Sequence, residues 1–214
     1  MLTRQRLIEL FTLAGENGWH MDDGKFPAEI KGDICPKEDN IFKALELIAI
    51  KEVKFVILGQ DPYFTNRIDT MEPMATGLAF AVDTDYPKTP TSLHNISKFL
   101  LPNEEKNLIN WAQTKGVLLL NAALTVPLLQ EGENADSVVG RHLRDWEEFT
   151  KCIIRQVKSE NPQAQIIAWG SKARDILDNA FRQFVWCKHP RLSAGDDNSF
   201  RAFCEGEIGR QLKS

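Results

Sequence analysis

Apolar runs of strand length alternate with helical patterns along most of this chain, and this alternation constrains the fold more than any other feature. The runs are almost continuously apolar, as expected for strands that are buried on both faces of a sheet. Strands are predicted over residues 53–59, 77–82, 116–122, 165–170 and 184–189. Helices are predicted over residues 40–49, 92–101, 105–115, 145–159 and 172–183. Strands that alternate with helices imply crossover connections, so we predict an α/β fold with a mostly parallel central sheet and helices on both faces.

Length and charge limit the classes of protein to consider. With 214 residues, 43% of them hydrophobic, the chain can bury one sizeable core, so we expect a single domain over residues 1–214. The net charge of −4 argues against a protein that binds nucleic acid by bulk positive charge. A nucleic-acid enzyme stays possible, because a local basic patch can hold a duplex on an acidic molecule.

The four cysteines, at positions 35, 152, 187 and 204, form no CxxC pair and have no ligand spacing with the four histidines. This pattern predicts reduced thiols and no metal site. The apolar runs are short, and residues 1–15 have the period of an amphipathic helix rather than the pattern of a signal peptide. We therefore expect a cytoplasmic protein that is not exported.

Polar side chains follow the predicted strands at the points where they end. In an open parallel sheet, ligands bind outside the carboxyl ends of the strands, so these residues are expected to converge. They are Gln60, Asp61, Asn121, Ser171 and His189. Each also has an ordinary structural interpretation: Asp61 before Pro62 is typical of a turn, Ser171 of a helix N-cap, and His189 of a buried structural histidine. Their joint placement nevertheless predicts an active site at this edge.

Six motifs in order along the chain resemble family 1 uracil-DNA glycosylases. They are GQDPY (59–63), GLAF (77–80), SLHNI (92–96), GVLLLN (116–121), WGS (169–171) and HPRLS (189–193). The resemblance implies a four-stranded parallel sheet, one strand fewer than the runs suggest. It also implies a monomeric DNA-repair enzyme that flips deoxyuridine out of single- or double-stranded DNA and releases uracil, with no metal or cofactor. The implied partners are uracil-containing DNA and a protein inhibitor.

The resemblance also implies a role for each residue of the pocket. Phe80 would stack on the uracil ring, Asn121 would read the edge of the base, and Tyr63 would exclude the methyl group of thymine, while the backbone around Gln60 completes the pocket. The two catalytic residues would be His189, which donates from a neutral imidazole to the departing uracil, and Asp61, which stabilises the cationic sugar and positions water.

A second set of residues would hold the DNA. By the same resemblance, three serines would contact phosphates, Leu192 would enter the vacated base stack, and Lys188 with Arg191 would supply positive charge. The serines are Ser92, Ser171 and Ser193.

The chain departs from the family pattern at three places. Phe64 stands where the family motif has histidine, and the connection over residues 65–74 is several residues longer than usual. The family's HPSPLS is shortened to HPRLS and is followed by Asp196 and Asp197. These two carboxylates predict weaker or more salt-sensitive binding of duplex DNA unless Lys188 and Arg191 offset them.

Two other functions remain open at this point. The long connection after Phe64 favours a glycosylase for another modified pyrimidine, although Tyr63 argues against bulky groups on the base. A non-catalytic DNA-binding or scaffold relative would be expected to lack Asp61, Asn121 or His189, and all three are present. A phosphate-binding glycine loop is absent from the sequence, which argues against a generic nucleotide binder. The acidic stretch QEGENAD, residues 130–136, is interpreted as a solvated loop.

Overall fold

The centre of the molecule is a four-stranded parallel sheet. A computed structural model describes residues 1–101, 107–192 and 196–213. The strands are β4 (Phe55–Gly59), β5 (Val117–Asn121), β7 (Gln165–Trp169) and β8 (Val185–Cys187). Their order across the sheet is β5-β4-β7-β8, and every neighbouring pair is parallel. The predicted fold class is confirmed.

The segment over residues 77–82, predicted as a strand, does not form one. Gly77 and Phe80 have φ values of 88° and 65°, which lie in the left-handed region and break an extended backbone. The segment is instead pinned beside the sheet, because the Ala79 N–H donates to the Leu119 carbonyl at 3.1 Å. The central sheet therefore has four strands, as the family resemblance implies, and not five.

The predicted helices agree with the structure in place but less well in length, and the last two helices, over residues 200–213, were not predicted. The helices are α1 (Arg4–Leu10), α2 (Thr12–Glu16), α3 (Lys43–Glu46), α4 (Thr91–Leu100), α5 (Leu108–Lys115), α6 (Leu143–Glu160), α7 (Ser171–Asp178), α8 (Phe200–Glu205) and α9 (Glu207–Lys213). The predicted helix over 40–49 is reduced to α3 between two short 3-10 turns, and α7 ends five residues before position 183. Residues 102–106, at the start of another predicted helix, lie outside the described residues.

Two small antiparallel pairs lie beside the main sheet. β1 (Leu2–Thr3) pairs with β2 (Glu29–Ile30), and β3 (Ile34–Cys35) pairs with β6 (Val126–Pro127). The second pair brings β6, which follows β5 in the chain, next to the segment that precedes α3. It thereby ties the carboxyl edge of the sheet to the N-terminal part of the molecule.

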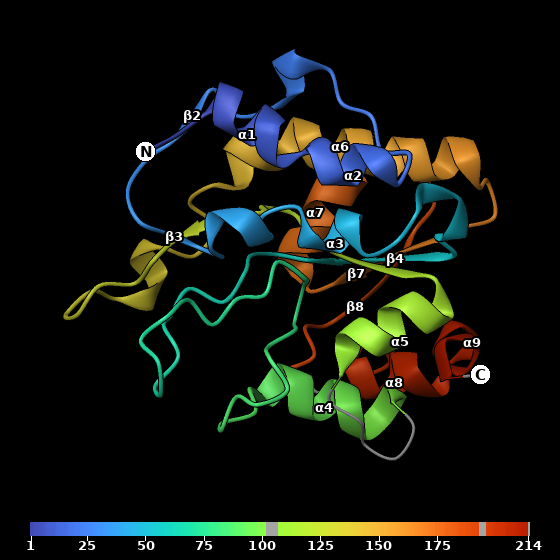
Figure 1. Ribbon diagram of the computed structural model, residues 1–214. Helices are drawn as coiled ribbons and strands as arrows, with labels where there is room; N and C mark the ends of the chain where they lie inside the picture. Colours follow the sequence, from blue (N-terminus) through green and yellow to red (C-terminus); the bar gives the residue numbers. More distant parts are fainter. Residues whose placement is uncertain (102–106, 193–195, 214) are drawn as a thin grey trace.

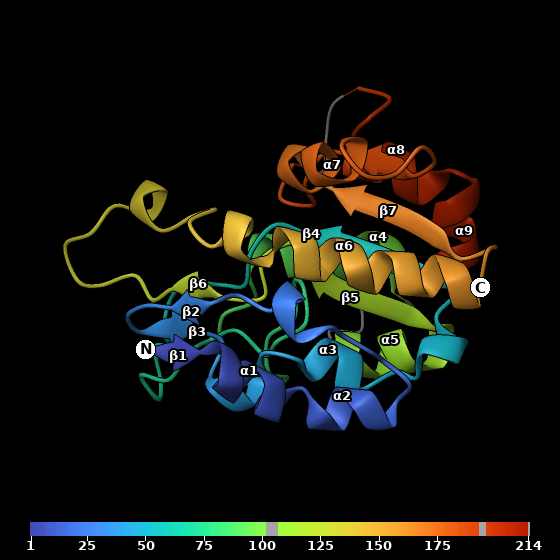
Figure 2. The same ribbon diagram turned by 90° about the horizontal axis from the view of Figure 1, so that it is seen from above.

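Helices cover the central sheet on both faces. Figure 1 shows α1, α2 and α6 on one side of the sheet and α4, α5, α8 and α9 on the other, and Figure 2 looks down on the α6 side. Side chains from all three layers form one apolar core that extends from Leu2 to Leu212 and includes Trp146, Phe149 and Trp169. Full burial of one large apolar side chain typically contributes about 1.5–3 kcal/mol.

The strand order places a topological switch point at one edge of the sheet. After β4 the chain forms β5 on one side of it, and the later strands β7 and β8 lie on the other side. The carboxyl ends of β4 and β7 are therefore the topological switch point, where open α/β sheets bind their ligands. Within the described parts of the chain, no helix has both the length and the apolarity that a membrane crossing requires.

Candidate active site

The turn after β4, residues 60–64, contains Asp61, which is expected to be catalytic, and we therefore call it the catalytic turn. Gly59, directly before it, packs closely against Asn121 and Phe80. Gly59 and Asn121, the last residues of β4 and β5, are paired in register. A Cβ atom at Gly59 would lie 2.8 Å from Asn121 Oδ1 and 3.1 Å from the Phe80 ring. Glycine is therefore required here, because any side chain would push the amide or the ring away. Asn121 itself is only 3% exposed.

Asp61 is held through one of its two carboxylate oxygens. Its Oδ2 accepts hydrogen bonds from the Gln60 side-chain amide at 2.7 Å and from the Gly140 backbone N–H at 2.9 Å. Its Oδ1 is buried and has no hydrogen-bond partner among the described residues. Burial raises the pKa of Asp61 to about 6, and the two donors oppose that rise. At neutral pH the Asp61 side chain is therefore mainly ionised, although its environment is poorly solvated.

His189 lies two residues beyond β8, with its ring against Gly170 at the end of β7. The Arg191 backbone N–H donates to His189 Nδ1 at 3.2 Å, so the hydrogen of the neutral ring is on Nε2. Burial and, to a smaller extent, the positive charge of Arg191 lower the pKa of His189 to about 4. His189 is therefore a neutral donor at physiological pH.

Phe80 lies between the proposed catalytic residues and the buried part of the site, which we call its floor and which includes Phe80 and Asn121. Its ring centroid lies 5.3 Å from that of Trp169 and 5.5 Å from that of His189. Tyr63 donates from its hydroxyl to the Phe80 carbonyl at 3.3 Å, and burial raises the pKa of Tyr63 so that this group stays neutral. Phe80 keeps its unusual backbone conformation (φ 65°) within this arrangement. Non-glycine residues with such strain are frequent at functional sites.

The residues expected to hold DNA are more scattered. Ser92 is buried in the first turn of α4, whereas Ser171 is the exposed first residue of α7. The N-cap interpretation of Ser171 is wrong, because Gly170 occupies that position and α7 has no side-chain cap. Asn95 of α4 donates to the Pro190 carbonyl at 2.7 Å and so ties this helix to the loop over residues 188–192, called the His189 loop.

The described end of the His189 loop is exposed to solvent. Leu192 is 54% exposed, and Arg191 is also exposed. Lys188 forms an ion pair with Asp196 at 2.7 Å, so much of its charge is already compensated. Ser193 lies outside the described residues.

Phe64 does not point into the site as a substitute for a polar residue. Its side chain packs against a small apolar cluster formed by Cys35, Ala75 and Val126. Its carbonyl accepts a hydrogen bond from the Leu129 N–H at 2.8 Å. Phe64, which stands where the family motif has histidine, therefore couples the catalytic turn to the neighbouring β3–β6 pair.

The lengthened connection over residues 65–74 folds into a hairpin. Asn66 and Pro73 form an antiparallel bridge, and buried Arg67 makes ion pairs with Asp69, Asp83 and Asp85 at 2.7–3.0 Å. These partners compensate the burial of the guanidinium, which would otherwise be strongly unfavourable. The hairpin projects on the same side of the molecule as residues 128–136 (Figures 1 and 2).

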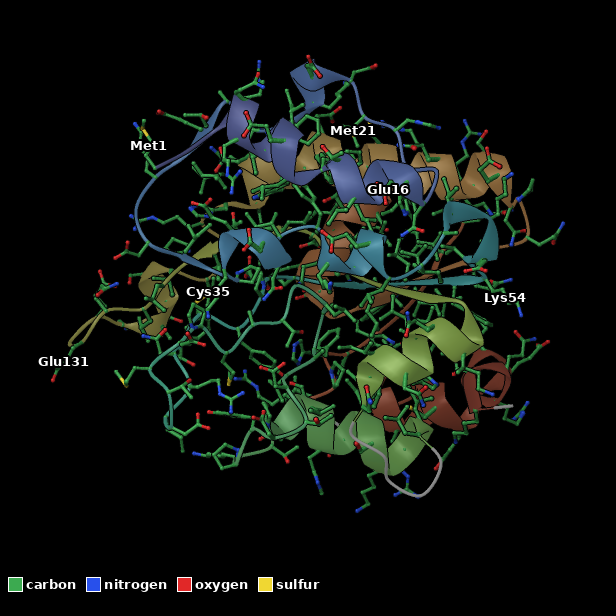
Figure 3. All side chains as sticks on the ribbon, in the orientation of Figure 1. Met1, Glu16, Met21, Cys35, Lys54 and Glu131 are labelled. Atoms are coloured by element: carbon green, nitrogen blue, oxygen red, sulfur yellow. The ribbon has the colours of Figure 1, made fainter. Side chains whose placement is uncertain are left out.

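Sequence reasoning missed two features of the site. The first is the Gly140 N–H on Asp61, which carries no side-chain signal. The second is the buried contact between Thr125 and His142, with Thr125 Oγ1 3.0 Å from His142 Nδ1. The acidic stretch 130–136 is mostly exposed, as expected, and Figure 3 shows Glu131 at its outer end. Among the described residues, no group of three or more His, Cys, Asp or Glu side chains could hold a metal ion.

Comparison with known proteins identifies the family. Residues 46–205 match the model of the Uracil DNA glycosylase superfamily. Uracil-DNA glycosylase from Streptococcus sanguinis (strain SK36) is 39% identical over 166 residues, which cover 74% of this chain and 70% of that protein. The crystal structure of mimivirus uracil-DNA glycosylase superposes with a TM-score of 0.63 at 25% identity, over 84% of this chain and 71% of that chain.

A second mimivirus structure is that of a glycosylase bound to UGI. A variant of mimivirus UNG in complex with UGI gives a TM-score of 0.61 at 28% identity over 73% of this chain. The match spans 58% of that longer chain. Together, the family match, the level of identity and the shared fold show that this chain belongs to the uracil-DNA glycosylase superfamily, the DNA-repair glycosylases that remove uracil.

Proposed function

We propose that this protein hydrolyses the N-glycosidic bond of deoxyuridine in DNA, releasing uracil and leaving an abasic site. The observation that carries the proposal is the position of the Phe80 ring, whose centroid lies 5.5 Å from that of His189 and which packs close to Gly59. Gly59 is the register partner of Asn121 and precedes Gln60 and Asp61 in the chain. A donor, a carboxylate and a base-reading amide are thereby gathered at one edge. The target nucleotide must leave the base stack to reach them, which requires a few kcal/mol.

His189 would stabilise the leaving group. As the bond breaks, negative charge develops on uracil, and the Nε2–H of the neutral ring would donate to the O2 atom of the base. The proton stays on Nε2, because the Arg191 N–H occupies Nδ1 and fixes the tautomer. A preorganised donor of this kind is typically worth about 3–4 kcal/mol in the transition state.

Asp61 would act on the sugar. The departing base leaves positive charge on C1′, and a nearby carboxylate stabilises such an oxocarbenium-like state, as in glycoside hydrolysis. Because Gln60 and Gly140 occupy Oδ2, the oxygen left to face the sugar or to orient the attacking water is Oδ1. No metal or other cofactor is required for this chemistry.

The buried floor would select the base. Asn121 can offer a donor to O4 of uracil and an acceptor to its N3–H, and cytosine reverses both groups. Mismatched buried polar groups of this kind can discriminate by a factor of about 10⁴ or more. Phe80 would stack on the ring, and Tyr63, fixed by its bond to the Phe80 carbonyl, would clash with the thymine methyl group.

The DNA itself would be held along the rim of the site, by Leu192 in the base stack and by phosphate contacts from Ser92, Ser171, Ser193, Lys188 and Arg191. Ser92 is the buried member of this set. We further propose that the chain, residues 1–214, is one domain, acts as a monomer in the cytoplasm and is open to a protein inhibitor at the same edge. The unpaired state of all four cysteines supports a reducing compartment, and the UGI complex of the mimivirus relative supports the inhibitor.

The test is an excision assay. The protein is incubated with EDTA and an oligonucleotide that carries one deoxyuridine, in single- and double-stranded form, and abasic sites are then cleaved with alkali. We expect strand scission for the wild type and none for the double variant Asp61→Asn with His189→Ala. No scission by the wild type, or undiminished scission by the double variant, would contradict the proposal.

A second candidate substrate is another modified pyrimidine. The hairpin over residues 65–74 favours it, because this extra segment begins directly after the catalytic turn. Tyr63 argues against it. A panel of oligonucleotides with thymine, 5-hydroxymethyluracil and cytosine decides between the two, since uracil should be released much faster than any of them.

A further inference from the structure

The segment over residues 128–142, here called the bracket segment, is hydrogen-bonded to the catalytic turn near both of its ends. Near its start, the Leu129 N–H donates to the Phe64 carbonyl at 2.8 Å. Near its end, the Gly140 N–H donates to Asp61 Oδ2 at 2.9 Å. Between these two bonds the segment extends away from the protein, with Glu131 at its outer end (Figure 3). The bracket segment therefore spans the turn that carries the catalytic carboxylate.

Two buried side-chain hydrogen bonds, which join Trp146, Thr125 and His142, fix the C-terminal end of the bracket segment. The Trp146 indole N–H donates to Thr125 Oγ1 at 2.7 Å. Thr125 Oγ1 lies 3.0 Å from His142 Nδ1, and since the hydroxyl accepts from Trp146, its own hydrogen is available for this nitrogen. All three side chains are buried. They join the residue before β6 to the start of α6, two residues after Gly140.

The backbone at Gly140 is suited to aim its N–H at Asp61. Its φ of 75° is a conformation that residues with side chains rarely adopt. Its carbonyl accepts from the Leu143 N–H at 3.2 Å, which couples the glycine to the first turn of α6. A Cβ atom here would lie 3.3 Å from Leu143 Cδ1 and 3.5 Å from Gln60 Nε2, so a side chain would press on the other donor of Asp61.

The bond from Gly140 favours the ionised form of Asp61. Hydrogen bonds to a carboxylate stabilise the charged state, and here they oppose the burial that raises the pKa of this group. Among the other titratable groups near this point, burial favours the neutral forms of Tyr63, His142 and His189. Asp145 and Arg141 act on His142 with opposite signs. Loss of the Gly140 donor should therefore appear as a change in the titration of Asp61.

We propose that His142, through its bond with Thr125, is a positioning residue for Asp61: it holds the Gly140 N–H on Oδ2, so that the carboxylate is ionised and its Oδ1 is directed to the reacting sugar. The inference rests on the proposed catalytic role of Asp61. The hydrogen bond itself can be tested without catalysis.

The first experiment follows the Gly140 amide by ¹H–¹⁵N NMR during a pH titration of the wild type and of Asp61→Asn. We expect the wild-type resonance to move with a midpoint near the Asp61 pKa of about 6, and this step to be missing in Asp61→Asn. A Gly140 amide that does not respond, or that responds identically in both proteins, overturns the proposal whether or not the protein excises uracil.

The second experiment measures pH profiles of kcat/KM for uracil excision by Thr125→Val, with Thr125→Ser as the matched control that keeps the hydroxyl. In Thr125→Val the acidic limb should move upward by about one pH unit, so that kcat/KM falls about tenfold below the limb and little above it. Thr125→Ser should follow the wild type. A fall of equal size at every pH, or a limb that does not move, contradicts the positioning role.

The two experiments separate two kinds of failure. If the wild type does not excise uracil, the proposed function is wrong, and the NMR titration still decides whether Gly140 reports on Asp61. If Thr125→Val does not fold, the wild-type and Asp61→Asn titrations remain decisive.

Discussion

The floor and the rim of the candidate site are built in opposite ways. On the floor, Asn121 and Phe80 are buried, and Asp61 has two hydrogen-bond donors fixed on one oxygen. On the rim, Leu192 and Arg191 are open to solvent, and Lys188 is occupied by Asp196. We propose that the two regions have different functions: the floor would determine bond cleavage and base choice, and the rim the strength of DNA binding. Substitutions should therefore separate into effects on kcat and effects on affinity.

The largest separation is expected between His189→Ala and Leu192→Ala. Removal of the preorganised Nε2–H should lower kcat by a factor of about 10²–10³ with little change in KM, because the donor acts on charge that develops only in the transition state. Leu192→Ala should act mainly on KM. Single-turnover kinetics on a deoxyuridine duplex measure both, and a similar change in kcat for the two variants would remove the distinction between floor and rim.

Asp61→Asn should make the folded protein more stable while it abolishes activity. Burial raises the folded-state pKa of Asp61 from 3.8 to about 6, so ionisation of this group opposes folding above that range. Two pKa units correspond to up to about 3 kcal/mol, and partial solvation reduces the gain to about 1–3 kcal/mol at pH 8. As pH falls through 6 towards 4 the carboxyl becomes neutral, and the gain should vanish. Urea unfolding at both ends of this range measures the effect.

The pH dependence of the reaction should follow the titration of the two ionisable residues of the floor, Asp61 and His189. Asp61 must be ionised and His189 neutral, with pKa values of about 6 and about 4. Below pH 6, kcat/KM should therefore fall about tenfold for each pH unit, and His189 should add to the loss only near pH 4. A limb whose midpoint differs from the pKa of Asp61 measured by NMR on the wild type would assign the limb to another group.

The smallest expected effect is on the rim. Asp196→Asn removes the partner of Lys188, so DNA binding should become a few-fold tighter and the slope of log K against log salt concentration should steepen by about one. Glu205→Gln, which removes a carboxylate from an ion pair with Arg201 on α8, is the matched control and should change neither quantity. Equal effects of the two variants would show that only the net charge matters.

Most residues of the floor could be predicted from the sequence by one rule, which is that parallel strands present their carboxyl ends at one edge of the sheet. Asp61 and His189 come two residues after β4 and β8, and Asn121 is the last residue of β5. The structure places the first and the last of these at adjacent strand ends and His189 against Phe80. The rule works because buried parallel strands have a strong sequence signal, which is a run of apolar residues of the right length.

Two parts of the site could not be obtained in this way. The segment GLAFAV has the composition of a strand, and only its left-handed residues, Gly77 and Phe80, exclude one. Glycine permits that conformation, but nothing in the identity of Phe80 predicts it. The Gly140 donor is a backbone group 79 positions from Asp61, so it depends on the path of the chain and not on a residue type.

The hairpin over residues 65–74 is closed at its own base. The Met74 N–H donates to the Thr65 carbonyl at 3.0 Å, and the bond from Tyr63 to the Phe80 carbonyl holds the two pocket residues on either side of it. Because the ends are fixed, extra length at the exposed tip adds only a slowly growing loop entropy and exerts no pull on the pocket. Thr70 and Met71 are exposed and, unlike Asp69, form no ion pair with buried Arg67, so an affinity tag or a fluorescent reporter could be inserted between them while the site residues keep their arrangement.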